Sequence, residues 1–205
     1  MVAAREDNYE DQYSKDGIFG DFTYSSPGVS RGLLISMIVR QSVFFAVKGK
    51  IKVLVMGAGH GYEVVSYIKG GYDVKAIDLY SPDIPMVKEV TTLASADNMP
   101  FEDKEFDLIH STEMMEHVPQ KLTNPILREC KRVAKRFVFT IATRDDPPYC
   151  THINIHPAWW WIKKFEKLGF NIVSAQQAAR LHIPFPEGHA SHFTWPDGVL
   201  IYGEC

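Results

Sequence analysis

The sequence lacks the features that mark several broad classes of protein. It has only three cysteines, Cys130, Cys150 and Cys205, odd in number and widely spaced. That pattern argues against a disulfide framework and favours a reducing compartment. Neither sign of charge dominates, since the formal net charge is -3. A nucleic-acid partner is therefore disfavoured, although this composition leaves room for a local basic patch.

Long hydrophobic runs, repeats and low-complexity tracts are also missing. The longest apolar stretch, residues 33–47, is interrupted by Ser36, Arg40 and Gln41 and is shorter than the ~20 residues needed to cross a bilayer. No signal peptide is evident at the acidic N-terminus. We therefore expect a cytoplasmic protein without a membrane partner. The sequence does not predict an oligomeric state.

Apolar segments alternate with helical patterns along the chain. This alternation predicts an α/β fold with a doubly wound, mainly parallel sheet. Residues 1–30 are polar and tyrosine-rich and are expected to form an N-terminal arm, with a single domain over 31–205. The expected strands are 51–56, 73–78, 90–94, 106–111, 136–142, 170–176 and 197–203, and the expected helices are 32–47, 61–69, 83–89, 121–134 and 157–168.

The most informative stretch is residues 53–78, VLVMGAGHGYEVVSYIKGGYDVKAID. An apolar strand runs into Gly57, Gly59 and Gly61, a helix follows, and a second strand ends on Asp78. Glycines at such a turn let backbone N–H groups and the next helix approach a ligand without a Cβ in the way. The carboxylate at the end of the second strand is suited to accept hydrogen bonds from a ribose diol. The pattern predicts a nucleotide-binding βαβ unit.

The spacing of the glycines separates the possible ligands. A dinucleotide fingerprint requires G-x-G-x-x-G, so that pyrophosphate can lie on the helix. This chain has G-x-G-x-G, with Tyr62 and Glu63 where the final glycine would stand. NAD and FAD are therefore disfavoured.

Three further segments follow in order: residues 95–101 (SADNMPF), Phe106–Ile109 (FDLI) and residues 111–118 (STEMMEHV). Together with the glycine turn they resemble the motifs of class I S-adenosylmethionine-dependent methyltransferases of the type 11-like group. The resemblance implies a Rossmann-like sheet of seven strands in the order 3-2-1-4-5-7-6, with the last strand antiparallel. It also implies S-adenosylmethionine as cofactor and S-adenosylhomocysteine as product.

By this resemblance the cofactor would be held by the glycine turn, the acid after the second strand, the segment after the third strand and the end of the fourth. Two departures stand out: Val55 replaces an acid that the family usually has before the first glycine, and Ser95 replaces an aspartate that often contacts the adenine. Glu63 or an N-terminal residue is a substitute for the first acid. The implied cofactor residues are Gly57, Ala58, Gly59, Gly61, Asp78, Leu79, Ala96, Asp97, Asn98, Met99 and Ser111.

Glu113, Glu116 and His117 recur at i, i+3 and i+4, so a helical turn would place them on one face. Two carboxylates and an imidazole can hold a divalent cation. The E-x-x-E-H pattern resembles the metal ligands of small-RNA 2′-O-methyltransferases and of ubiquinone-pathway O-methyltransferases, and His152 is the candidate for a fourth ligand. Many members of the superfamily carry the pattern without metal, and we favour that interpretation, with the glutamates as caps and hydrogen-bond partners.

His152 lies in the loop after the fifth strand, which in this family faces the transferred methyl group. A histidine there or at His117 is suited to take a proton from a substrate hydroxyl, because imidazole titrates near working pH; loop hydrogen bonding is the alternative role. Residues 180–195 are expected to form a long, histidine- and aromatic-rich connection that covers the substrate.

The sequence thus predicts methyl transfer to a small-molecule acceptor, at oxygen. Two alternatives stay open: an RNA or protein methyltransferase with a metal-assisted E-x-x-E-H site, and a cofactor-binding protein without catalysis.

Overall fold

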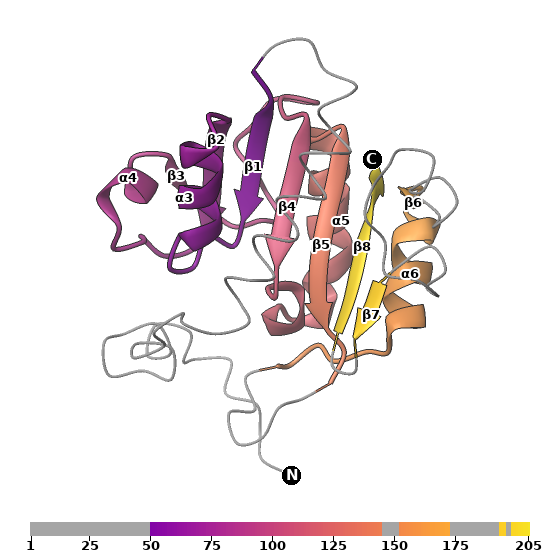
Figure 1. The fold of residues 1–205 in the computed structure, drawn as a ribbon. Helices are drawn as coiled ribbons and strands as arrows, with labels where there is room; N and C mark the ends of the chain where they lie inside the picture. Colours follow the sequence, from indigo (N-terminus) through magenta and orange to yellow (C-terminus); the bar gives the residue numbers. More distant parts are fainter. Residues whose placement is uncertain (1–49, 145–151, 173–192, 196–197) are drawn as a thin grey trace.

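The computed structural model of the protein describes residues 50–144, 152–172, 193–195 and 198–205 (Figure 1). The expected N-terminal arm, the helix expected at 32–47 and most of the connection expected at 180–195 lie outside the described residues. The strands are β1 (Lys52–Met56), β2 (Asp73–Asp78), β3 (Thr91–Leu93), β4 (Leu108–Thr112), β5 (Arg136–Ala142), β6 (Asn171–Ile172), β7 (Phe193–Trp195) and β8 (Gly198–Glu204). The helices are α3 (Tyr62–Lys69), α4 (Pro85–Lys88), the 3-10 turn η1 (Met115–His117), α5 (Gln120–Val133) and α6 (Ala158–Lys167).

The strands form one sheet in the order β3-β2-β1-β4-β5-β8-β6 (Figure 1). Pairs from β3 to β5 are parallel, and β8 is antiparallel to both β5 and β6. With β8 in the place of the seventh strand, this is the predicted order 3-2-1-4-5-7-6 with an antiparallel last strand. The predicted α/β fold is confirmed, and the strand order switches between β1 and β4, with β2 and β3 on one side and β5 on the other.

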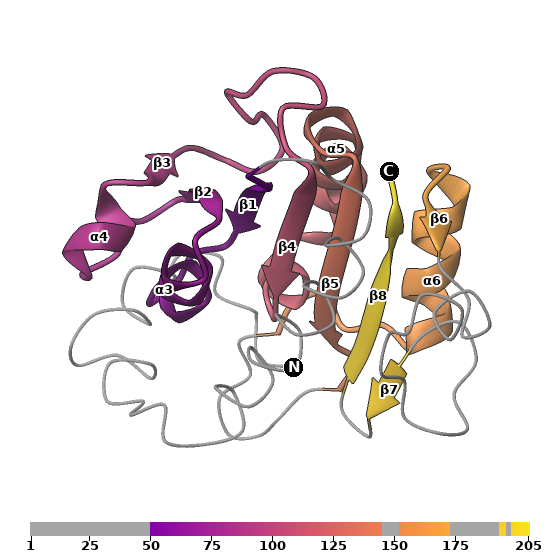
Figure 2. The same cartoon turned by 45° about the horizontal axis from the view of Figure 1, so that its top comes forward.

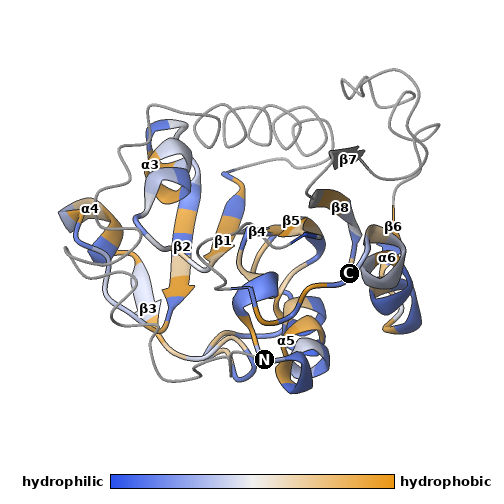
Figure 3. Ribbon diagram, turned by 90° about the horizontal axis from the view of Figure 1, so that it is seen from below, coloured by the Kyte–Doolittle hydropathy of each residue, from blue (hydrophilic) through white to orange (hydrophobic). Residues whose placement is uncertain are grey.

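Helices cover both faces of this sheet, with α3 on one side and α5 and α6 on the other (Figures 2 and 3). Alternate residues of β1 serve the two faces: Val53 and Val55 pack with the α3 side, and Leu54 and Met56 with the α5 side. A strand buried on both faces needs an unbroken apolar run, which is why β1 reads as KVLVM. In α6 the consecutive indoles diverge as their helical spacing requires, since Trp161 is fully buried whereas Trp159 is 59% exposed.

One expectation about the C-terminal part was wrong. The sequence interpretation extended the long connection to Trp195, but residues 193–195 form β7, which pairs antiparallel with residues 198–200 of β8. Two aromatic residues flank Thr194, a composition that favours strands, and β8 offers them a free edge beyond the short β6. Within the described parts of the chain, none of the helices is long and apolar enough to span a membrane.

Two glycines with similar backbone angles allow a test of the packing between α3 and α4. Gly61, with φ of +84°, caps α3, and a Cβ there would lie 2.7 Å from both methyl groups of Val87. Gly71, with φ of +81°, has nothing within 4 Å of the same position. We predict that Gly61→Ala lowers the free energy of unfolding by about 2–5 kcal/mol, since it adds overpacking to left-handed strain.

The matched variant Gly71→Ala carries the strain alone and should cost about 1–2 kcal/mol. Urea unfolding of both variants, followed by circular dichroism, measures the difference. Equal losses in the two proteins would contradict the assigned contact with Val87.

Candidate active site

A pocket of about 420 Å³ opens beyond the carboxyl ends of the central parallel strands. This is the edge at which ligands of open α/β sheets bind, and the volume falls within the range of roughly 300–1,000 Å³ that is usual for small-molecule sites. The pocket is lined by Gly57, Ile77, Asp78, Leu79, Tyr80, Ala94, Ser95, Ala96, Met114, His117, Val118, Pro119, Lys121, Leu122, Ile126 and Ile153.

The turn between β1 and α3 forms one wall of the pocket through Gly57. The backbone N–H of Gly57 donates to the carbonyl of Ile77 over 2.9 Å, and its φ of +78° is one that glycine adopts without strain. A Cβ at this position would lie 2.8 Å from Cγ of Met114. The close approach of Met114, together with the positive φ, explains why the turn requires glycine here.

Asp78 ends β2 at the floor of the pocket. Its Oδ2 accepts a hydrogen bond from the N–H of Gly59 at 2.9 Å, and its Oδ1 accepts one from the N–H of Tyr80 at 3.1 Å. The carboxylate is therefore fixed between the glycine turn and the residues that follow β2. Carboxylate oxygens have further lone pairs, so both can still accept from a ligand hydroxyl.

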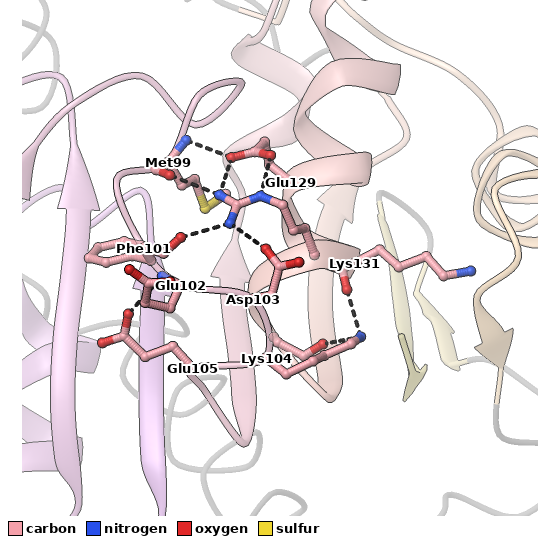
Figure 4. Close-up of polar contacts among 10 residues, drawn as sticks. Met99, Phe101, Glu102, Asp103, Lys104, Glu105, Glu129 and Lys131 are labelled. Atoms are coloured by element: carbon pink, nitrogen blue, oxygen red, sulfur yellow. Dashed lines mark hydrogen bonds and ion pairs between the residues drawn. The ribbon is translucent and has the colours of Figure 1, made fainter.

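The segment after β3 closes the far side of the pocket with Ser95 and Ala96. The Ser95 hydroxyl donates to the carboxylate of Asp97. Farther along, the N–H of Met99 donates to Glu129 at 2.8 Å (Figure 4), and Arg132 donates to the Met99 carbonyl at 2.9 Å.

Glu129 and Arg132 thus attach the segment after β3 to α5. They also pair with each other at 2.7 Å, and the hydrogen bonds from Arg132 hold the pKa of the Glu129 carboxyl below its usual value. Arg132 further donates to the carbonyl of Phe101 at 2.7 Å. The Glu129–Arg132 pair therefore fixes the segment after β3 against α5, and neither residue lines the pocket.

Two histidines meet at the opposite side, where the loop after β4 touches the segment after β5. The rings of His117 and His152 form a T-shaped pair with centroids 4.8 Å apart. Their approach is fixed by the backbone, since the N–H groups of Ile153 and Asn154 both donate to the carbonyl of Glu116 at 2.9 Å. His152 Nδ1 also lies 3.3 Å from the carbonyl oxygen of Arg144.

Asn154 adds a side-chain bridge to the same junction. Its buried amide donates to the carbonyl of Met115 and to the hydroxyl of Thr123 in α5, each at 3.1 Å. The sequence interpretation gave no role to this residue.

Glu116 is fully buried beside this junction. Its Oε1 accepts from the N–H of Ala142 at 3.2 Å. Burial and the neighbouring carboxyl of Glu113 raise the pKa of Glu116 well above its usual value. These surroundings therefore favour the protonated form of the Glu116 carboxyl over its charged form.

The structure brings three of the four suggested metal ligands together. Ligand atoms of Glu116, His117 and His152 all lie within 4.8 Å of one another. Glu113 is outside this group, and its φ of +48° places it in the left-handed region just after β4. The helical turn of the sequence interpretation, with all three E-x-x-E-H residues on one face, is wrong, because η1 begins only at Met115.

The suggested cofactor residues divide into two sets. Gly57, Asp78, Leu79 and Ala96 line the pocket itself. The others support it or lie beside it: Ala58, Gly59, Gly61, Asp97, Asn98, Met99 and Ser111, of which Ala58, Gly61, Met99 and Ser111 are buried.

Sequence reasoning did not single out several apolar residues of the lining, among them Met114, Leu122 and Ile153. Met114 and Ile153 adjoin the named residues Glu113 and His152, but apolar side chains in such places carry no distinguishing signal.

A family model described as a methyltransferase domain matches residues 54–139. This range spans the elements that form most of the pocket wall, from β1 through β5. No curated protein matches the sequence at a significant level.

Solved structures match the fold at low sequence identity. The PH0226 protein of Pyrococcus horikoshii is 15% identical, with a TM-score of 0.62 over 88% of this chain and 92% of its own. A 1,6-didemethyltoxoflavin-N1-methyltransferase of Burkholderia thailandensis, solved with that compound and S-adenosylhomocysteine, is 14% identical, with a TM-score of 0.55 over 86% and 87%. A geranyl diphosphate C-methyltransferase of Streptomyces coelicolor, solved with Mg²⁺, geranyl diphosphate and S-adenosylhomocysteine, is 13% identical, with a TM-score of 0.57 over 86% and 79%.

The raised pKa of Glu116 predicts a pH-dependent stability. The folded protein keeps a proton that the unfolded chain releases above about pH 4.5, the usual value for this group. The free energy of unfolding should therefore fall as the pH rises above 4.5, by up to about 1.4 kcal/mol per pH unit until the folded pKa is reached. Glu116→Gln keeps an acceptor for Ala142 without a titrating group, so its stability should decline less over the same interval.

Urea unfolding from pH 4 to pH 8 measures this difference between the two proteins. Glu166→Gln, at an exposed position in α6, is the matched control and should follow the unaltered protein. Parallel pH profiles for the unaltered protein and Glu116→Gln would show that the carboxyl is ionised in the folded state.

Proposed function

We propose that the chain is a class I S-adenosylmethionine-dependent methyltransferase, in keeping with the methyltransferase-domain model that matches residues 54–139, and that it transfers the methyl group to an oxygen of a small-molecule acceptor. The observation that carries this proposal is the pair His117 and His152 beside the pocket, with ring centroids 4.8 Å apart. An imidazole in that place is suited to receive the proton of a hydroxyl acceptor as the acceptor oxygen becomes methylated.

Two further observations support a small acceptor. The solved relatives from Burkholderia thailandensis and Streptomyces coelicolor hold a toxoflavin precursor and geranyl diphosphate. The formal net charge of -3 gives this chain no general attraction for a nucleic acid.

The residues around the pocket fit the cofactor. Asp78 is oriented by Gly59 and Tyr80 and would accept hydrogen bonds from the ribose hydroxyls. Gly57 lines the pocket and has no side chain, so its backbone can approach the ligand closely. When bound, the cofactor supplies an electrophilic methyl group on a sulfonium. The protein has to align the acceptor with it, and alignment provides a large part of the acceleration.

His152 is the better candidate of the two for the proton. Its Nδ1 faces the carbonyl of Arg144 at 3.3 Å, which favours the tautomer with the proton on Nδ1 and the basic lone pair on Nε2. His117, whose side chain lines the pocket, would orient His152 through the ring contact. In this proposal His152 acts as general base and His117 positions it and the acceptor.

A second candidate function is metal-assisted transfer, favoured by the convergence of Glu116, His117 and His152. A cation there would activate an acceptor hydroxyl directly. We prefer the metal-free reaction because Glu116 is fully buried and its Oε1 already accepts a hydrogen bond from the N–H of Ala142.

Methyl transfer from labelled S-adenosylmethionine tests the function, with Asp78 as the probe of the cofactor site. We predict transfer of label to the small-molecule fraction of a metabolite extract and binding of S-adenosylhomocysteine measurable by calorimetry. Asp78→Asn should weaken that binding by roughly 1.5–3 kcal/mol, because it removes charge-assisted hydrogen bonds. Label in an RNA fraction instead would contradict the proposed acceptor class.

Asp73→Asn is the matched control. Asp73 begins the same strand that Asp78 ends, and its exposed side chain lies far from the pocket at the amino end of β2. Its variant should bind S-adenosylhomocysteine as the unaltered protein does. Equal affinity in folded Asp78→Asn protein would remove the assigned ribose contact.

The role of His152 predicts a kinetic effect without a binding effect. His152→Ala should lower turnover about 100-fold or more, the usual size of a general-base contribution, and leave the affinity for S-adenosylhomocysteine nearly unchanged. The unaltered enzyme should keep full activity in EDTA. His156→Ala, which removes a ring stacked on Trp160 at 3.6 Å, serves as the control and should retain turnover.

Activity lost in EDTA and restored by a divalent cation would favour the metal-assisted alternative. Near-normal turnover of His152→Ala in EDTA would leave alignment of the acceptor as the main source of catalysis.

A further inference from the structure

Three polar side chains form a buried chain of hydrogen bonds on the α3 face of the sheet. The hydroxyl of Tyr67 in α3 lies 3.2 Å from Nδ1 of His110 in β4, and Nε2 of His110 lies 2.8 Å from the hydroxyl of Thr112. Tyr67 and His110 are 2% and 1% exposed. Since His110 and Thr112 are two residues apart on a strand, they share one face of the sheet.

The protonation states of Tyr67 and His110 set the direction in which these hydrogen bonds donate. Burial lowers the pKa of His110 to about 4, so the ring is neutral at pH 7 and has one donor and one acceptor nitrogen. Burial, Tyr72 and Glu63 raise the pKa of Tyr67, so its hydroxyl keeps its proton. Among the described residues, that hydroxyl makes its hydrogen bond to His110.

A buried donor without an acceptor is costly, so Tyr67 donates to Nδ1 of His110. The other nitrogen, Nε2, then carries the proton and donates to the oxygen of Thr112. As a result the hydroxyl proton of Thr112 cannot point back to the histidine. It is available for an acceptor elsewhere.

That proton lies at the ligand end of the sheet. Thr112 is the last residue of β4 and the one residue of that strand with a partly exposed side chain. The register of β1 with β4 pairs Val53 with Leu108 and Val55 with His110. Continued by two residues, it places Thr112 beside Gly57, the glycine that lines the pocket.

We propose that Tyr67 and His110 are positioning residues that hold Thr112 as a hydrogen-bond donor to the amino-acid carboxylate of S-adenosylmethionine. This inference rests on the proposed function. With the adenosine between Asp78 and Ala96, the amino-acid end has to pass Gly57 toward β4. A hydroxyl whose oxygen already accepts from a histidine requires an acceptor, and the carboxylate is the strongest acceptor of that end of the ligand, whereas its ammonium group only donates.

Two ligands with the same nucleoside test the contact. S-Adenosylhomocysteine has the carboxylate, and 5′-deoxy-5′-methylthioadenosine lacks it. We expect Thr112→Val to weaken binding of the first about tenfold or more and to leave binding of the second unchanged. Thr112→Ser, which restores the hydroxyl, should recover most of the affinity.

Tyr67→Phe tests the positioning role. Without the phenol, no donor fixes Nδ1 of His110 as the acceptor nitrogen, so the ring loses its preference for the tautomer that donates to Thr112. The variant should therefore lose affinity for S-adenosylhomocysteine alone, and should have no further effect when Thr112 is already valine. Thr140→Val is the matched control, because Thr140 pairs with Thr112 across β4 and β5.

The possible outcomes are distinct. Equal losses for both ligands in Thr112→Val, or unchanged binding of S-adenosylhomocysteine, would overturn the carboxylate contact while leaving the cofactor assignment in place. Additive losses in the Tyr67→Phe and Thr112→Val double variant would overturn the positioning role. If the unaltered chain binds neither ligand, the cofactor assignment fails, and this inference fails with it.

Discussion

The hydrogen bonds to the carbonyl of Glu116 join the two loops that bring His117 and His152 together. Parallel strands bring the loops after β4 and β5 to the same edge, but the sheet alone does not fix how their residues meet. Two N–H groups, from Ile153 and Asn154, converge on that carbonyl, and the amide of Asn154 adds a bridge to α5. Because Glu116, Asn154 and Thr123 are buried, the loss of one of these hydrogen bonds would leave a buried polar group unsatisfied. The contact between His117 and His152 follows from this bonding.

Burial also decides which groups near the site carry charge. Burial raises the pKa of Glu116 and lowers the pKa of His110 to about 4. His110 is therefore neutral near pH 7 and acts through directed hydrogen bonds. Asp78 is different: its carboxylate accepts from two backbone N–H groups and remains partly exposed. Asp78 thus lies where a polar ligand is expected, and the fully buried Glu116 and His110 lie behind the pocket surface.

The sequence predicted the fold because strands, turns and strand ends are set by residues that are close together in the chain. The glycines around Gly57 and the acid Asp78 mark a strand, a turn and a strand end, and parallel strands then bring these points together. Contacts between distant segments have no such signature. Nothing in the sequence pairs Tyr67 with His110, forty-three residues later, or places Met114 against the first glycine. The metal-ligand pattern was only partly right, because the left-handed backbone of Glu113 interrupts the turn that its spacing suggested.

The position of β8 has a consequence for synthesis of the chain. Every residue of β5 pairs with β8, and β6 and β7 share the other edge of that same strand. When synthesis has reached only Ile172, β5 therefore has an unpaired, apolar edge. The sheet is complete only after residue 204 has been added. Exposed strand edges are templates for pairing with other chains. Truncation within β8 would remove the strand that joins β5 to β6 and β7. We expect such truncated chains to aggregate.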